Sequence, residues 1–203
     1  MQDIRKTSSK TELFLEETAV KEHNIESQNV LDWISDFNAP QDQAEIHKDH
    51  VIGIGDWLLE SDSILRWLEG AGSIRTIWCS RFKGSGKTVM SSVVINHLLE
   101  QAREDGVSVA FAYCKFNVKE SREAEKVVGS LVKQLAQKDS QVLKQLSDEK
   151  HKGALRPNFH TLQNYLLQLC HNLGTIFVVV DAFDECLDPN ERLKLLSILK
   201  QVE

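Results

Sequence analysis

The residue types between Lys83 and Thr88, in the string KGSGKT, suit the binding of a polyphosphate. Gly84 and Gly86 allow the backbone to turn its N–H groups inward, and they carry no side chain that would block a phosphate. We expect Lys87 to bridge the terminal phosphates and the Thr88 hydroxyl to bind a phosphate-bound Mg²⁺. The apolar residues that follow predict a helix whose positive end points at the anion. The predicted nucleotide contacts of this loop are Arg81, Lys83, Gly84, Ser85, Gly86, Lys87, Thr88 and Val89.

The complete pattern for such a loop is G-x-x-x-x-G-K-S/T between a strand and a helix. Arg81 stands where that pattern has its first glycine. A non-glycine residue in a bend that requires φ > 0 costs on the order of 1–2 kcal/mol. We therefore predict that hydrolysis is slow or absent, although the arginine charge could offset part of the loss. The alternative is that GSGKT is a flexible turn before a helix, because short motifs also match by chance.

A second group of chemically capable residues follows the apolar run at residues 176–180, in the string TIFVVVDAFDEC. The run predicts a buried parallel strand, and Asp181 then lies at its carboxyl end, where ligands bind in open α/β sheets. We expect Asp181 to hold Mg²⁺, directly or through water. Asp184 or Glu185 would orient and deprotonate a water that attacks the γ-phosphate. The alternative is a buried strand followed by a solvated acidic turn.

The segments that must position these residues alternate between apolar strands and amphipathic helices. This alternation predicts an α/β fold with a parallel sheet and right-handed crossovers. The expected strands are residues 74–79, 107–114 and 176–180. The expected helices are 27–37, 57–68, 89–99, 121–135 with a shorter helix after it to 146, 159–173 and 190–202, and residues 38–50 are expected to be a linker.

We divide the chain into three parts on this basis. Residues 1–28 form a polar lead with a weak helix or disorder, residues 29–72 form a helical flank, and residues 73–203 form the core.

The composition is that of an ordinary globular protein: 203 residues, 41% hydrophobic and 27% charged. A net charge of −6 argues against general nucleic-acid binding. No apolar run is long enough to span a membrane, and the first residues lack the apolar segment of a signal peptide. The four cysteines have no C-x-x-C spacing, which suits reduced thiols. We therefore expect a cytoplasmic protein that binds neither nucleic acid nor membrane.

The sequence resembles a known family at several places. The string GIGDWLL at residues 53–59, the Trp78-Cys79 pair and the phosphate loop are similar to fungal NACHT-type signalling NTPases. These are also described as nephrocystin-3-like N-terminal domains, within the STAND class of P-loop ATPases. The string DAFDEC resembles their second acidic motif, in which a small residue, here Ala182, follows the metal-binding aspartate.

The resemblance implies a P-loop NTPase fold, a three-layer αβα arrangement with a mainly parallel sheet. It also implies that the segment before the first strand helps to enclose the nucleotide base, which makes Ile54 a candidate base contact. In that family a further strand follows the helix at 190–202 and inserts between the strands at 74–79 and 176–180. We therefore expect the core to be incomplete at its C-terminal end.

The leading interpretation is a switch that binds ATP and Mg²⁺, has at most weak ATPase activity, and controls a larger signalling assembly through protein partners or self-association. A phosphate loop serves kinases equally well, so a small-molecule phosphotransferase remains an alternative. The sequence has no arginine-rich lid segment, which favours the switch. Arg81 also leaves open a catalytically silent interaction fragment.

Overall fold

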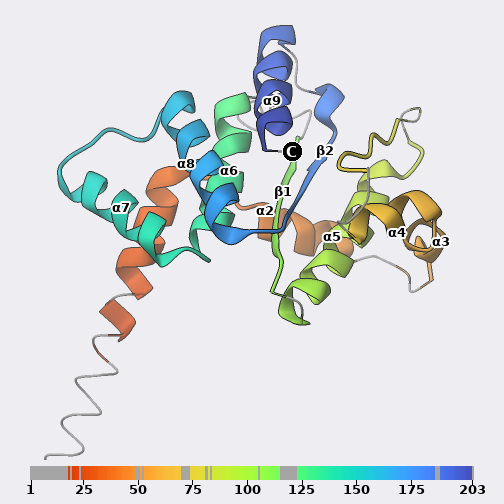
Figure 1. The fold of residues 1–203 in the computed structure, drawn as a ribbon, viewed down its shortest axis with the longest axis horizontal. Helices are drawn as coiled ribbons and strands as arrows, with labels where there is room; N and C mark the ends of the chain where they lie inside the picture. Colours follow the sequence, from red (N-terminus) through yellow and green to blue (C-terminus); the bar gives the residue numbers. More distant parts are fainter. Residues whose placement is uncertain are drawn as a thin grey trace, which may run out of the picture.

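The computed structural model describes residues 18, 20–22, 24–48, 51, 53–69, 74–80, 82, 84–104, 106–114, 123–185 and 188–202. It is a mixed α/β structure, mostly helical, with a small parallel sheet (Figure 1). Residues 24–34, here called the N-terminal helix, are followed by α2 (Ala39–His47), α3 (Asp56–Leu59), α4 (Asp62–Leu68), α5 (Lys87–Glu104), β1 (Ser108–Tyr113), α6 (Ala124–Ala136), α7 (Ser140–His151), α8 (Phe159–Leu173), β2 (Ile176–Asp181), the 3₁₀ helix η2 (Phe183–Glu185) and α9 (Pro189–Gln201).

The two strands, β1 and β2, run parallel and in register along their whole length. Ser108 pairs with Ile176 at one end, and Tyr113 pairs with Asp181 at the other. The Cys114 N–H donates to the carbonyl of Asp181 at 3.1 Å and extends the pairing past the end of β1. The carboxyl ends of both strands therefore lie at the same edge of the sheet, which is where the candidate chemistry was expected.

Helices cover both faces of this sheet, because the side chains of β1 alternate between two hydrophobic clusters. One cluster contains Ala110 and Ala112 together with the N-terminal helix, α6, α7, α8 and α9. The other contains Phe111 and Tyr113 together with α2 and α5. All six residues of β1 are buried, as the continuous apolar run predicted.

A side chain of α6 closes the outer edge of β1. Gln134 Nε2 donates to the Phe111 carbonyl at 2.8 Å, and Gln134 Oε1 accepts from the Phe111 N–H at 3.2 Å. The Lys138 ammonium donates to the carbonyl of Val107 at 3.1 Å on the same edge. The amide of Gln134 thus makes the two bonds that a neighbouring strand would make, so the sheet ends at this edge.

The expected strand at residues 74–79 is wrong, because residues 74–80 form neither strand nor helix. A strand requires a neighbour in register, and the sheet contains only β1 and β2 among the described residues. The segment is held instead by α4, where Trp67 Nε1 donates to the Arg75 carbonyl at 3.1 Å. The ring of Trp67 also packs edge-on against Phe177 of β2, with centroids 5.0 Å apart.

The expected linker at residues 38–50 is also wrong, because α2 occupies most of it. Asn38 caps this helix, with its side-chain oxygen accepting from the N–H of Gln41 at 3.3 Å. Pro40 lies in the first turn, where its missing N–H has no cost. Residues 38–50 show no helical period in their apolar side chains, because only Ala39 and Gln43 of α2 are buried.

The remaining expected elements are confirmed, with α8 found at the predicted residues and the helix expected at 57–68 divided into α3 and α4. The amphipathic helix expected near residues 27–37 ends at residue 34 and packs into the core. Arg156 caps its end by donating to the carbonyls of Asp32 and Trp33, both at 2.8 Å. Hydrogen bonding and charge from the same guanidinium hold the pKa of Asp36 below its usual value.

No helix among the described residues is both long and apolar enough to cross a membrane.

Asp139 provides a test of how the helical layer responds to acid. Its Oδ2 accepts from Asn172 Nδ2 at 2.7 Å, and its Oδ1 caps α7 by accepting from the N–H groups of Gln141 and Val142 at 3.0 Å. The bond from Asn172, and then the two backbone bonds, lower the pKa of Asp139 below 3.8. Its contribution to stability is therefore present above about pH 4 and is lost as the pH falls through the lowered folded value.

We expect Asp139→Ala to reduce the free energy of unfolding by about 1 kcal/mol at pH 7 and by less at pH 3. Urea denaturation at both pH values measures this difference. Asp139→Asn keeps the capping oxygen without the charge, so it should lose less stability at pH 7. An equal loss for Asp139→Ala at the two pH values would contradict the assignment.

Candidate functional site

The turn before α5 has the backbone shape that its glycines were expected to provide. Gly84 and Gly86 have φ values of 85° and 80°, in the left-handed region that favours glycine. A Cβ added to either would meet no described atom within 4 Å, so the space beside the turn is open. Between them, Ser85 has a buried Oγ that finds no hydrogen-bond partner within the part of the chain that the structure describes. A buried polar atom without a partner beside open backbone is consistent with a ligand cradle.

Lys87 is the first residue of α5, and it lies half-buried against the turn. Its ammonium donates to the carbonyl of Phe82 at 3.3 Å, so the side chain folds back across the turn. The first turn of α5 carries no acidic residue. A cation at the positive end of a helix is unfavourable for the helix alone. This arrangement becomes favourable when an anion lies between the ammonium and the helix end.

Asp181 ends β2, and only 6% of its surface is exposed. Its Oδ1 accepts a hydrogen bond from Ser91 Oγ on α5 at 3.0 Å. No lysine, arginine or histidine among the described residues forms an ion pair with it. Burying a carboxylate without a cation is costly. The Asp181 carboxylate is therefore a candidate for binding a cation.

Ser91 is the functional candidate that the sequence analysis missed. It follows Thr88 by three residues, so the two side chains lie on one face of α5, about 4.5 Å apart along its axis. The bond from Ser91 thus holds the Asp181 carboxylate against the first half of α5, the same part of the helix that carries the exposed Thr88. The spacing of the two hydroxyl residues was available in the sequence, but their contact with residue 181 was not.

The backbone changes direction sharply after Asp181. Ala182 has a φ of 54°, which makes it the one non-glycine residue with positive φ in the described ranges. This left-handed conformation strains any residue that has a Cβ, and β-branched or bulky residues most. The chain then enters η2, which contains Asp184 and Glu185, and Asp184 is exposed.

An aromatic contact joins the segment before the turn to the segment after Asp181. The rings of Trp78 and Phe183 pack edge-on with centroids 5.5 Å apart. Aromatic pairs of this geometry stabilise by about 0.5–1.5 kcal/mol beyond the area they bury. Residues separated by a hundred positions are thereby held next to one another at the edge of the sheet that contains Asp181.

Ile54 lies in a turn that contacts α5. An added Cβ on Gly55 would come within 3.2 Å of both methyl groups of Val93, so the turn approaches α5 closely. Ile54 and Val89 remain exposed, as does Thr88. The structure thus brings most of the predicted contacts to α5 and its approach, whereas Arg81 and Lys83 lie outside the described residues.

A buried network of polar groups joins α2, α5 and β1. The Tyr113 hydroxyl donates to Gln43 Oε1, and Gln43 Nε2 donates to the carbonyl of Ser92 at 2.9 Å. His47 Nδ1 lies 3.1 Å from Ser92 Oγ. Burial, together with the negative charges of Asp181 and Asp42, raises the pKa of Tyr113 well above its usual value. Tyr113 therefore stays neutral. The contacts of Gln43 and His47 with Ser92 hold α2 against the centre of α5.

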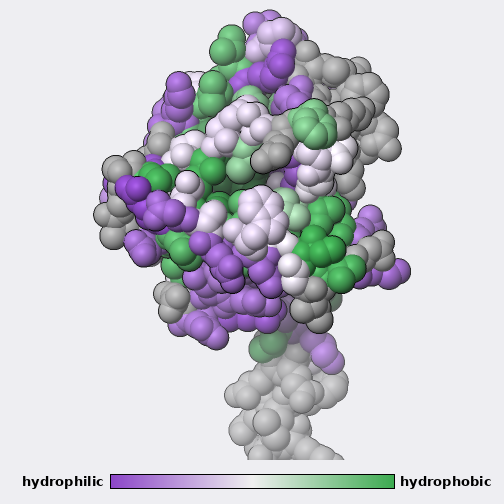
Figure 2. Space-filling model, turned by 90° about the vertical axis from the view of Figure 1, so that its right-hand side faces the viewer, coloured by the Kyte–Doolittle hydropathy of each residue, from purple (hydrophilic) through white to green (hydrophobic). Residues whose placement is uncertain are grey.

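The surface over α3, α4 and α5 is partly apolar. Figure 2 shows this side of the molecule, with green apolar side chains gathered at one border and inside a shallow hollow. The exposed large hydrophobic residues of α3, α4 and the segments next to them in the sequence include Ile54, Trp57, Leu65, Trp78 and Phe82. Such a mixture of aromatic and aliphatic groups beside a polar turn is common in sites that bind small ligands.

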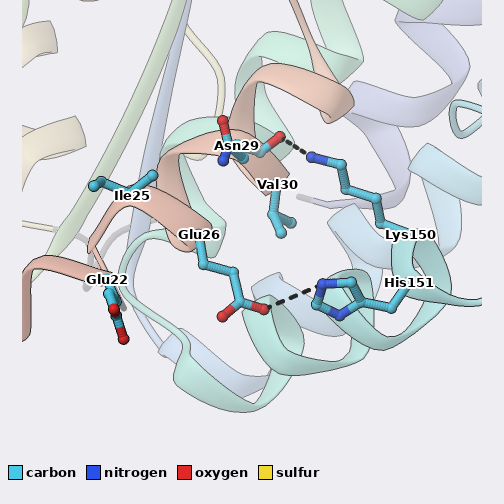
Figure 3. Close-up of a pocket in the computed structure, with 7 residues that line it drawn as sticks. All are labelled: Glu22, Ile25, Glu26, Asn29, Val30, Lys150 and His151. Atoms are coloured by element: carbon cyan, nitrogen blue, oxygen red, sulfur yellow. Dashed lines mark hydrogen bonds and ion pairs between the residues drawn. The ribbon is translucent and has the colours of Figure 1, made fainter. Parts of the chain in front are cut away.

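A separate hollow of about 240 Å³ lies between the N-terminal helix and α7 (Figure 3). Two pairs of its polar groups contact one another across it. Lys150 Nζ donates to the Asn29 carbonyl at 2.6 Å, and His151 Nε2 lies 3.5 Å from Glu26 Oε1. These contacts join the N-terminal helix to α7, so the hollow belongs to the packing interface between the two helices.

The comparison with protein families gives one match. The model of the nephrocystin 3 N-terminal family matches residues 53–203, which is well over half of the chain. Searches of the curated proteins and of the solved structures each found no match. The matched range begins after α2 and includes the turn at Gly84–Gly86, Ser91 and Asp181. The chain therefore belongs to the nephrocystin 3 N-terminal family.

Proposed function

We propose that this protein binds ATP together with Mg²⁺ at the start of α5 and acts as a nucleotide-dependent switch. One observation carries the proposal: the buried Asp181 carboxylate has no ion-pair partner in the described part of the chain, and Ser91, which donates to it, follows Thr88 by about one turn of α5. A divalent cation held between the Thr88 hydroxyl, Asp181 and a phosphate would compensate that buried charge.

The described residues fit the phosphates as well as the cation. Gly84 and Gly86 leave open space beside the turn, and the unpartnered Oγ of Ser85 is available to donate to a phosphate oxygen. The first N–H groups of α5 point in the same direction and carry a partial positive charge. Lys87 adds a full charge. A polyphosphate would therefore receive hydrogen bonds from backbone, hydroxyl and ammonium groups together.

Each residue has a distinct role in this mechanism. Bound Mg²⁺ would supply charge neutralisation at the phosphates. Thr88 and Asp181 would hold it, and Ile54 would contact the base from the turn packed on α5. Asp184 or Glu185 would orient the attacking water, and the exposure of Asp184 leaves it accessible to solvent.

The switch would operate through contacts that change with the ligand. Lys87 donates to the carbonyl of Phe82, and a phosphate would draw that ammonium away from the carbonyl. Phe82 follows the segment that contains Trp78. The ring of Trp78 packs on Phe183, which is two residues after Asp181. A ligand that binds one arrangement of these segments more tightly shifts the population toward it. Slow hydrolysis, proposed from Arg81, would prolong the bound state.

We further propose that the chain works as a NACHT-like STAND NTPase of a larger signalling assembly in the cytoplasm, through protein partners or self-association. The support for this is the family match over residues 53–203 together with the motifs GSGKT and DAFDEC, which lie within it.

The test is a thermal-shift titration of the protein with ATP and with GTP, each with Mg²⁺ and with EDTA. A ligand at 100 times its Kd stabilises by about 2.7 kcal/mol, which is a rise in Tm of roughly 5–10 °C for a chain of this size. We expect that rise with ATP and Mg²⁺ and a smaller rise with EDTA. No shift with either nucleotide would contradict the proposal.

Phosphate release, measured on the same samples, separates the switch from an enzyme. The switch predicts a turnover well below the roughly 10 s⁻¹ of a typical enzyme. Rapid turnover without an acceptor would indicate an ATPase, and turnover that requires a small-molecule acceptor would indicate a phosphotransferase.

A further inference from the structure

Two consecutive serines in the middle of α5 have different partners. Ser92 is fully buried, its carbonyl accepts from Gln43, and its hydroxyl lies within hydrogen-bond distance of His47. Ser91 is half-buried, and its hydroxyl donates to Asp181 Oδ1 at 3.0 Å. Ser92 thus connects α5 to the supporting helix α2, whereas Ser91 connects α5 to the candidate cation ligand.

We propose that Ser91 is a positioning residue that orients the Asp181 carboxylate for the bound cation. The inference rests on the proposed nucleotide function and adds a residue to that site. Ser91 does not itself touch the nucleotide; it acts through Asp181.

The geometry leaves the carboxylate free to bind a cation while Ser91 holds it. An ionised carboxylate has two oxygens with about four acceptor positions, and Ser91 occupies one of them, on Oδ1. The backbone of Asp181 is fixed separately, because its carbonyl accepts from the Cys114 N–H at 3.1 Å. With the backbone held by the sheet and one oxygen held by Ser91, the other oxygen has a defined direction.

The position of Ser91 on α5 also supports this role. Ser91 and Thr88 lie on one face of α5, so the same rigid element carries the hydroxyl expected at the cation and the hydroxyl that holds its carboxylate ligand. Hydrogen-bond partners of metal ligands typically account for a factor of 10–100 in metal affinity. Loss of the Ser91 hydroxyl should therefore lower the affinity of the site for the cation and leave the direct phosphate contacts unchanged.

The experiment measures ATP affinity across a series of Mg²⁺ concentrations, with EDTA as the zero point, by titration calorimetry. For Ser91→Ala we expect about a tenfold increase in the Mg²⁺ concentration that gives half of the gain in affinity. The affinity measured in EDTA should stay within about twofold of the parent, because the phosphate contacts remain. Ser91→Cys keeps the volume but donates weakly, so it should behave like Ser91→Ala even if the alanine variant folds poorly.

Two further variants serve as controls. Ser91→Thr retains the hydroxyl and should keep the Mg²⁺ dependence of the parent. Ser197→Ala, on the exposed face of α9, removes a helical hydroxyl that accepts from Gln201 Nε2 at 3.4 Å and should also match the parent. The Tm of each variant without ligand shows whether the substitution has changed the stability of the fold.

The possible results distinguish the role of Ser91 from the proposed nucleotide binding. If the parent binds ATP with Mg²⁺ and Ser91→Ala and Ser91→Cys have the same Mg²⁺ dependence as the parent, the role of Ser91 is wrong and the proposed function stands. If all three Ser91 variants lose the dependence equally, the hydroxyl is not what matters, and the inference is again wrong. If the parent does not bind ATP at any Mg²⁺ concentration, both proposals fail together.

Discussion

Replacing Lys87 with alanine is expected to abolish the rise in Tm that ATP and Mg²⁺ produce. Lys87 supplies the full positive charge at the start of α5, and its ammonium already lies across the turn, 3.3 Å from the carbonyl of Phe82. Charge-assisted bonds to phosphate are about twice as strong as neutral ones. We expect the affinity for ATP to fall by at least a hundredfold, or about 2.7 kcal/mol.

The same substitution should not harm the fold, and this separates a binding defect from an unfolding defect. A cation at the positive end of a helix is unfavourable, so without ligand Lys87→Ala should be as stable as the parent or more stable by about 0.3–1 kcal/mol. Lys144→Ala, at an exposed position of α7, is the matched control and should retain the full ATP response. If Lys87→Ala binds ATP as well as the parent does, the assignment of the loop is wrong.

Ile34→Ala is expected to lower the free energy of unfolding by about 2–5 kcal/mol, because it leaves a cavity in the larger hydrophobic cluster. Ile34 is 3% exposed, and its carbonyl lies against Gly129 of α6. For a chain of this size the loss corresponds to a fall in Tm of roughly 5–15 °C. Chemical denaturation and thermal unfolding measure it directly.

This result bears on the extent of the folded unit, since Ile34 lies outside the matched range of residues 53–203. Ile25→Ala on the same helix is the matched control: Ile25 is 63% exposed, and its truncation should cost less than about 0.5 kcal/mol. If Ile34→Ala costs no more than Ile25→Ala, the N-terminal helix does not contribute to the stability of the core.

The sequence alone determined the elements whose patterns are local. Residues 159–173 have an apolar helical period, and α8 has the predicted bounds. The apolar runs that became β1 and β2 were recognisable because continuous apolar side chains are typical of parallel strands. β1 is buried throughout as predicted, whereas four of the six residues of β2 are half-buried. The glycines at 84 and 86 likewise predicted the turn before α5, where both have the positive φ that glycine adopts readily.

Tertiary structure decided what depends on distant neighbours. The segment at residues 74–80 is apolar enough for a strand, but strand formation requires a partner in register, and none is described. Residues 39–47 lack a strong apolar pattern, yet they form α2. This helix is held by the hydrogen bonds of Gln43 to Ser92 and Tyr113. The bond from Ser91 to Asp181 spans 90 residues of sequence. The sequence predicted the helix that contains Ser91 and the strand that ends at Asp181, but only the packing of α5 against β2 brings the two side chains together.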